Sequence, residues 1–354
     1  MFSKFIHEFI FIFYAVLAAL CYGASIPIAK ILLNNIPPIF MAGLLYSGAG
    51  LGMLLLNFCR NKNHRKTEAK ITKKELPYTI LMVILDVLAP VFLMIGLLKN
   101  NAATVSLLNN FEIVATSLIA MIIFKEAIGK RTGIAIILIT IASIVLSVDD
   151  YSSLSFSLGS VLVLLACICW GIENNCTSKL SLKDPLEIVI IKGIGSGLTS
   201  LMIAFVLNQY SINIFYILST LLLGFVAYGL SIYLYIYAQR NLGAARTSAY
   251  YAIAPFIGSG LSFVIFKEIP TISYMVALAI MIVGVYFIAF EKHEHLHIHE
   301  KLKHEHRHNH NDGHHNHIHE IPIVGEHNHL HVHNLLKHRH QHMPDIHHSH
   351  EHKD

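Results

Sequence analysis

Residues 101–126 read NAATVSLLNNFEIVATSLIAMIIFKE, and residues 243–268 read GAARTSAYYAIAPFIGSGLSFVIFKE. The two segments align without a gap from a shared Ala-Ala pair to a shared Phe-Lys-Glu end. Nearer the start of each half, Cys21-Tyr22-Gly23 matches Cys169-Trp170-Gly171. Each quoted segment holds an apolar run long enough to cross a bilayer. The alignment therefore predicts two related halves, each built from membrane-spanning helices.

The composition places the body of the chain in lipid. Of its 354 residues, 54% are hydrophobic and only 14% are charged, whereas a soluble globular protein has about 25% charged residues. The formal net charge of +4 is too small to indicate a nucleic-acid partner, and no basic-aromatic segment supports one. The five cysteines lie in or at the end of apolar runs without a Cys-x-x-Cys pair, so we interpret them as small buried hydrophobes.

Ten apolar runs have roughly the length that the hydrocarbon layer requires. They lie near residues 9–33, 37–59, 76–98, 101–124, 131–148, 157–179, 185–207, 212–238, 241–266 and 270–290. The first run is too long for the core of a signal peptide and no small-residue cleavage site ends it, so we expect a retained helix. The predicted fold is an all-α membrane protein of about ten transmembrane helices, with one five-helix repeat over 9–148 and a second over 157–290.

The basic residues predict the orientation of these helices. Lysine and arginine gather in the loops after the second, fourth, sixth and eighth spans, and basic loops remain cytoplasmic. Both termini are therefore expected in the cytoplasm, with the helices in the plasma membrane. Because five is an odd number, the second repeat enters the membrane upside down. Inverted repeats are a building plan of secondary transporters.

The sequence resembles the EamA-type members of the drug/metabolite transporter superfamily. The resemblance rests on the segments Ala18–Ser25 and Cys169-Trp170-Gly171, and on Phe124-Lys125-Glu126 followed by Gly133. It covers about residues 9–290 and leaves the C-terminal tail outside the family pattern. It implies ten helices in two inverted repeats, solute transport without ATP hydrolysis, and a central cavity lined mainly by the third, fourth, eighth and ninth helices.

Several polar side chains lie within the apolar spans, where they usually face a cavity or a polar partner. Asp86 lies near the middle of the third span, and Glu112 near the middle of the fourth. The spacing of Asn109, Glu112 and Thr116 places them on one face of an uninterrupted helix. The predicted cargo-binding or coupling residues are Asp86, Asn109, Glu112, Thr116, Tyr228 and Tyr250. The alternative is a structural polar network without a transport role.

Two further charges, Glu173 and Lys192, come from consecutive spans at similar depth. We interpret them as a structural ion pair that fixes the packing of the sixth and seventh helices. Pro27, Pro90 and Pro255 lie inside spans and should bend or break them.

The segment 291–354 holds 23 of the 25 histidines, and we expect it to be disordered without metal. Imidazole is the commonest protein ligand of divalent transition metals, so the tail is predicted to bind Zn, Ni, Co or Cu, although the helical body requires no cofactor. The predicted ligands are His293, His295, His297, His299, His304, His306, His308, His310, His314, His315, His317, His319, His327, His329, His331 and His333. The alternative is a solvating tail without a selected metal. Two His-Glu-x-x-His matches are expected by chance in such a segment, and we reject an enzyme.

Three functions remain open on the sequence alone. The first is a transporter of an organic metabolite or amine with a regulatory, metal-responsive tail. The second is a transporter of a divalent metal whose tail gathers the ion. The third is a membrane-anchored metal store or sensor that does not transport. The expected partners are the lipid bilayer, a small solute or metal-ion cargo and a second copy of the chain in a homodimer.

Overall fold

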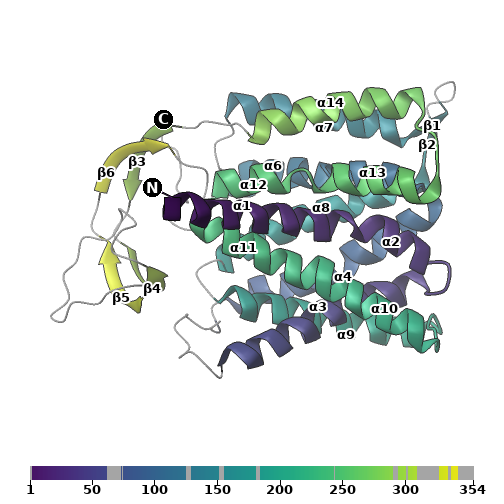
Figure 1. Ribbon diagram of the computed structural model, residues 1–354, viewed down its shortest axis with the longest axis horizontal. Coiled ribbons are helices and arrows are strands. Elements are labelled where there is room, and N and C mark those ends of the chain that lie inside the picture. Colours follow the sequence, from purple (N-terminus) through teal and green to yellow (C-terminus); the bar gives the residue numbers. More distant parts are fainter. Residues whose placement is uncertain are drawn as a thin grey trace.

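The computed structural model describes residues 2–61, 73, 75–124, 129–150, 155–180, 184–242 and 244–289, together with the backbone of four tail strands. Its body is a bundle of long helices that lie roughly parallel or antiparallel to one another (Figure 1). The N-terminus and the tail strands lie at one end of the bundle. The short strands β1 (Val148–Asp150) and β2 (Ser155–Phe156) pair at the other end.

The helices form ten segments in the described part of the chain, and several segments contain a break. The first half contains α1 (Phe2–Gly23) with α2 (Ser25–Leu32), α3 (Pro38–Asn61), α4 (Leu76–Lys99), α5 (Ala102–Leu108) with α6 (Phe111–Phe124), and α7 (Lys130–Ser147). The second half contains α8 (Leu158–Leu180), α9 (Pro185–Val206), α10 (Ile214–Gly224) with the π-helical η1 (Phe225–Leu230) and α11 (Ser231–Leu242), α12 (Ala244–Tyr251) with α13 (Ala254–Phe266), and α14 (Ile272–Ala289).

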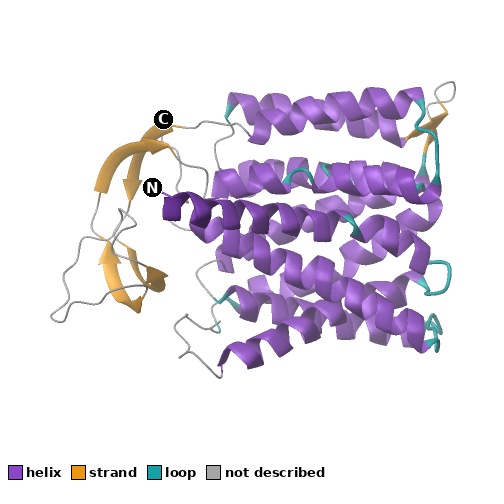
Figure 2. Ribbon diagram, viewed as in Figure 1, coloured by secondary structure: helices purple, strands orange, loops and turns teal. Residues whose placement is uncertain are grey.

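Eight of these helical segments are long and apolar enough to cross a membrane within the described residues. The remaining two predicted spans correspond to α12–α13, which is interrupted, and to α14, whose apolar stretch Ile272–Ile288 is slightly shorter. Among the residues that the structure describes, strands occur only outside the bundle (Figure 2). The prediction of an all-α membrane protein is confirmed.

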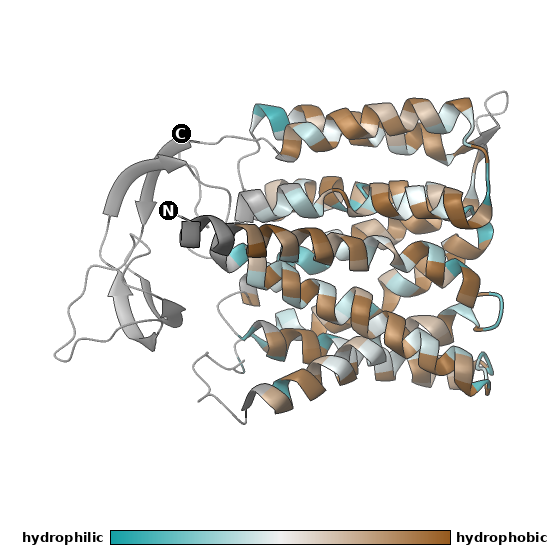
Figure 3. Ribbon diagram, viewed as in Figure 1, coloured by the Kyte–Doolittle hydropathy of each residue, from teal (hydrophilic) through white to brown (hydrophobic). Residues whose placement is uncertain are grey.

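The outer face of the bundle has the character of a lipid-facing surface. Large apolar side chains point outward on many helices, such as Ile122, Val206 and Val264, which are 70%, 80% and 75% exposed. In Figure 3 hydrophobic residues cover most of the helices, and hydrophilic residues gather toward helix ends and loops. Exposed apolar surface on this scale is unfavourable in water and favourable in hydrocarbon.

The pairing of helices obeys the symmetry that two inverted repeats require. Contacts between α4 and α8 are matched by contacts between α11 and α1, and those between α6 and α8 by those between α13 and α1. The pairs α3–α9 and α7–α14 each join a helix to its own counterpart, and the pair α5–α13 joins the fourth span to the ninth. This arrangement supports the division into repeats at 9–148 and 157–290, which stays a prediction.

Two helices are interrupted at matching places. The fourth span turns at Asn109–Asn110, between α5 and α6, and the ninth turns at Ala252–Ile253, between α12 and α13. In the alignment that pairs Asn101 with Gly243, the second interruption lies one residue later than the first. Pro255 explains the second break, because its ring clashes with the carbonyl of Tyr251 and offers no N–H. At the first break, the side chain of Asn110 donates to the carbonyl of Leu107 at 3.1 Å, which satisfies an end of α5.

Glycines bring α3 and α9 into close contact. A Cβ atom at Gly193 would lie 2.4 Å from the backbone nitrogen of Gly50, and one at Gly197 would lie 2.4 Å from the Ser47 hydroxyl oxygen. Small residues at helix interfaces are a common means of helix association in membranes. Here they let two helices from different halves approach backbone to backbone.

The structure describes four strands in the tail, and its disorder without metal stays a prediction. Its described residues form β3 (Glu294–His299) paired with β6 (Leu336–Gln341), and β4 (Leu302–His308) paired with β5 (His327–His333), both antiparallel. Segments such as His327–His333 alternate histidine with other residues, and a period of two is typical of a strand. The predicted ligands His293, His310, His314, His315, His317 and His319 lie outside the described residues.

Candidate transport site

The interior of the bundle contains an ion triad built on three helices. Lys192 of α9 places its Nζ 2.8 Å from Oε1 of Glu173 on α8, and 3.4 Å from Oδ2 of Asp86 on α4. The Asp86 and Glu173 side chains are 0% and 2% exposed, and that of Lys192 is 14% exposed. The contact predicted between Glu173 and Lys192 is therefore present, and Asp86 joins it as a third member. Two carboxylates facing one ammonium leave the triad with one net negative charge when all three are ionised.

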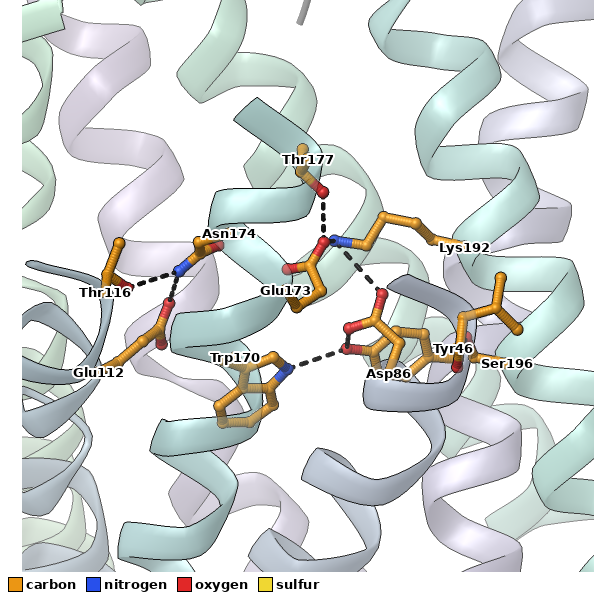
Figure 4. A network of polar contacts seen from close by, with 11 residues as sticks. Tyr46, Asp86, Glu112, Thr116, Trp170, Glu173, Asn174, Thr177, Lys192 and Ser196 are labelled. Atoms are coloured by element: carbon orange, nitrogen blue, oxygen red, sulfur yellow. Dashed lines mark hydrogen bonds and ion pairs between the residues drawn. The ribbon is translucent and has the colours of Figure 1, made fainter. Parts of the chain in front are cut away.

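Aromatic donors hold the Asp86 side of the triad (Figure 4). The hydroxyl of Tyr46 on α3 donates to Oδ1 of Asp86 at 2.9 Å, and Nε1 of Trp170 on α8 donates to that hydroxyl oxygen at 3.2 Å. On the Glu173 side, the Thr177 hydroxyl donates to the carboxylate. Hydrogen bonds to charged groups are stronger than those between neutral groups, so these donors offset part of the cost of burying the triad.

A second cluster surrounds Glu112 near the start of α6. Nδ2 of Asn174 on α8 donates to Oε1 of Glu112 at 2.8 Å and contacts Oγ1 of Thr116 at 3.3 Å. Glu112, Thr116 and Asn174 all keep part of their surface accessible. Glu112 has no cation partner among the described residues. Its charge is therefore available to a ligand, whereas those of Asp86 and Glu173 already face Lys192.

Tyrosines from four helices form a connected aromatic cluster in the interior of the bundle. The ring of Tyr22 on α1 lies 6.0 Å from that of Tyr228 on η1 and 5.9 Å from that of Tyr251 on α12, between ring centroids. Tyr228 also lies 5.6 Å from Tyr46. The hydroxyls of Tyr22, Tyr228 and Tyr251 lie within electrostatic range of the Glu112 carboxylate. A carboxylate beside aromatic rings offers a cation both charge and π-faces.

The structure brings together only some of the predicted site residues. Glu112 and Thr116 share one partner, Asn174, as their spacing suggested. Asp86 lies in the ion triad instead of beside Glu112, because α4 packs against α8 and α9. Asn109 does not continue the face of Glu112 and Thr116, since the helix turns at Asn109–Asn110. The assumption of an uninterrupted helix was wrong at this point.

The tyrosine prediction needs a similar correction. Tyr228 lies in the aromatic cluster as expected, but the contribution of α12 comes from Tyr251 and not from its neighbour Tyr250. Consecutive helical residues point about 100° apart, so the ring of Tyr250 leaves the side of α12 that contacts Tyr22. The sequence offered no basis for choosing between them before the partner helices were known.

Other interior residues were missed on the sequence. Tyr46 and Trp170 look like ordinary apolar side chains, and only their contacts reveal the polar links to Asp86. Lys30, within the first span, donates to the carbonyls of Leu97 and Asn100 at 2.5 and 2.8 Å, where α4 ends. A cation there compensates the partial negative charge of the helix C-terminus. In the sequence, the position of Lys30 shortly after Pro27, where a helix break is expected, was the feature that could have indicated this role.

Secondary transporters are commonly built from two repeats whose helices break at matching points near buried charged groups. The fold and the site therefore indicate a membrane transport protein. The chain belongs to the EamA-like transporter family, whose model matches residues 9–148 and 157–290.

Individual relatives are more distant. An uncharacterized transporter of Methanothermobacter thermautotrophicus is 25% identical over 288 residues, which cover 77% of this chain and 83% of the relative. An uncharacterized solute carrier family 35 member of Schizosaccharomyces pombe is 26% identical over 117 residues, 31% of this chain and 23% of the relative. A solved structure titled "Crystal structure of protein" superposes with a TM-score of 0.56 at 13% identity, over 77% of this chain and 94% of that chain. This last likeness concerns the fold alone.

Proposed function

We propose that the chain is a secondary transporter of small organic cations, located in the plasma membrane with both termini in the cytoplasm. The observation that carries the proposal is the half-buried carboxylate of Glu112, which has no cation partner among the described residues and lies within electrostatic range of Tyr22, Tyr228 and Tyr251. An amine or quaternary ammonium group gains Coulomb energy from the carboxylate and cation–π energy from the rings. The same cluster has one carboxylate and few other oxygen ligands, which suits an organic cation better than a hard divalent ion.

The position of the cluster fits a transport role. Glu112 follows the break between α5 and α6, and Tyr251 precedes the break between α12 and α13. Interrupted helices at the interface of two repeats are where secondary transporters bind cargo. Rocking of one repeat against the other would change the side of the membrane from which a solute can enter the cluster. The N-terminus and the tail lie at the same end of the bundle (Figure 1), which supports two termini on one side of the membrane.

Uptake into vesicles that contain the purified protein tests the proposal. The panel contains amines, quaternary ammonium ions, neutral metabolites and divalent metals, each with and without a pH gradient. We expect uptake of at least one organic cation, and a loss of roughly tenfold or more in Glu112→Gln. Glu187→Gln, on the first turn of α9, serves as the control and should transport normally. Normal transport by Glu112→Gln, or transport of neutral solutes alone, would overturn the proposal.

A second function, linkage to divalent metal ions, is supported by the tail. The backbone register pairs His304 with His331, His306 with His329 and His308 with His327. Residues directly opposite each other in an antiparallel pair lie about 5 Å apart at their Cβ atoms, a spacing from which two imidazoles can reach one ion. We propose that the tail binds Zn, Ni, Co or Cu and makes transport responsive to it.

Deleting residues 291–354 separates this linkage from a metal-store function. If the tail regulates, the truncated protein should still transport organic cations but no longer respond to added zinc. If the body only anchors a metal store, the truncated protein should have no activity, and the intact Glu112→Gln protein should behave like the wild type.

A further inference from the structure

A small cavity lies between the helix breaks, and Tyr22 of the aromatic cluster forms part of its lining. Its volume is about 10 Å³, close to the minimum that holds one atom-sized ligand. The lining residues come from α1, α2, α5 and α13 and from the turns at their ends. They include Gly23, Ser106, Asn109 and Gly258. The cavity is therefore bounded by three interrupted helices and both halves of the chain.

Two residues that line the cavity each have a side-chain oxygen without a hydrogen-bond partner among the described residues. The oxygens are Oγ of Ser106 and Oδ1 of Asn109, and these two residues are 1% and 6% exposed. Leaving a buried polar group unsatisfied costs about 1–3 kcal/mol. Both residues lie at the end of α5 and are three positions apart, so they occupy the same face of that helix. Their oxygens require a ligand that the protein itself does not supply.

A backbone carbonyl adds a third oxygen. In an uninterrupted helix the carbonyl of Gly23 would accept from the N–H of residue 27, but residue 27 is Pro27, which has no N–H. A Cβ atom at Gly258 would lie 2.6 Å from that carbonyl oxygen and 2.9 Å from Oγ of Ser106. The carbonyl and the hydroxyl therefore converge on the side of the cavity where residue 258 has no side chain. Only glycine at 258 leaves this space open.

The unpartnered hydroxyl of Ser106 is not a feature that both repeats share. The counterpart of Ser106 in the alignment is Ser248, whose Oγ lies 2.9 Å from the hydroxyl of Tyr235 in a hydrogen bond. The same residue type is thus paired in one repeat and unpaired in the other. This asymmetry is expected where one repeat builds a ligand site and the other does not.

We propose that this cavity binds a sodium-sized monovalent cation. Its ligands are neutral oxygens (a hydroxyl, an amide and a backbone carbonyl), and the carbonyls of unwound helices coordinate sodium ions in other secondary transporters. The absence of a carboxylate among the lining residues disfavours a divalent ion, which requires more ligand charge. A cation here would hold α1, α5 and α13 together at their breaks, the segments whose relative motion transport requires. Use of the ion as a coupling ion rests on the proposed transport function, whereas its binding does not.

Thermal unfolding of the purified full-length protein in detergent tests the binding. Sodium chloride is titrated against choline chloride at constant ionic strength. A ligand that binds only the folded state raises the midpoint progressively with its concentration, so sodium but not choline should stabilise the wild type. Ser106→Ala and Asn109→Ala should raise the sodium concentration needed for half of the effect by about tenfold or more. The control is Ser143→Ala on α7, whose buried hydroxyl donates to the carbonyl of Ile139 at 2.8 Å. It should retain the wild-type response to sodium.

Each outcome of this titration decides the proposal. Equal effects of sodium and choline on the wild type would show that the cavity holds water only, and would overturn it even if the variants failed to fold. A sodium effect that both Ser106→Ala and Asn109→Ala retain would also overturn it, because the ion would then bind elsewhere. Uptake by the vesicles above in sodium and in choline is measured separately. Failure of the transport proposal therefore leaves the binding result unaffected.

Discussion

Nζ of Lys192 lies 2.8 Å from a carboxylate oxygen of Glu173 and 3.4 Å from one of Asp86. A single ammonium thus serves two carboxylates that come from different repeats, since Asp86 belongs to the first and Glu173 to the second. Removing one partner of a buried ion pair leaves an uncompensated charge, which costs about 3–5 kcal/mol.

Lys192→Met should therefore destabilise the protein by about 3–5 kcal/mol. Because the cost comes from unpaired charge, the triple variant Lys192→Met, Asp86→Asn, Glu173→Gln should regain most of the lost stability. The free energy of unfolding, or the thermal midpoint of the purified protein in detergent, measures both effects. A triple variant as unstable as Lys192→Met would show that packing, and not charge pairing, determines the cost.

Asn174 positions Glu112, and its removal should weaken cargo binding more than it weakens the fold. Asn174→Ala deletes the 2.8 Å hydrogen bond to Glu112 and leaves the carboxylate free to rotate. We expect KM for the transported cation to rise about threefold to tenfold, the size of a typical net hydrogen-bond contribution of about 0.5–1.5 kcal/mol. In a Glu112→Gln background the same substitution should add little, because the two residues act as one unit. Additive effects of the two substitutions would contradict this coupling.

The close contact between α3 and α9 gives a test of helix packing. Gly193→Ala places a Cβ atom 2.4 Å from the backbone nitrogen of Gly50, so the two helices must separate. We expect a loss of about 1–3 kcal/mol in the free energy of unfolding. Gly133→Ala on α7 is the matched control, since no atom lies within 4 Å of the added Cβ. Alanine should be neutral or slightly stabilising there, because it favours a helix over glycine. Equal effects at the two sites would argue against the α3–α9 contact.

The tail gives a prediction of pH dependence. Metal binding by residues 291–354 should weaken as the pH falls below about 6, because a protonated imidazole cannot bind a metal ion. Titration of the purified protein with zinc at pH 7.5 and at pH 5.5 measures the change in affinity, with the protein truncated before residue 291 as the control. A tail that bound zinc equally at both pH values would have to use ligands other than histidine.

Much of the fold could be predicted from the sequence, since the bilayer allows few solutions. The apolar runs marked the positions of the helical segments, and the matching segments around Asn101 and Gly243 indicated the two halves. The contact between Glu173 and Lys192 followed from two opposite charges at similar depth in neighbouring spans. Asp86 could not be assigned to the same group, because nothing in the local pattern states which helix faces α4.

The sequence by itself determined that the chain lies in a membrane, how its helices are divided between two halves, and which charged side chains remain in the interior. The tertiary structure alone decided that Asp86 pairs with Lys192, that Tyr251 and not Tyr250 contacts Tyr22, and that Ser106 and the carbonyl of Gly23 meet at Gly258. The physical reason is that burial in lipid depends on composition and length, which are local properties. The pairing of polar groups depends on helix rotation and on helix breaks, which are fixed only when distant segments pack together.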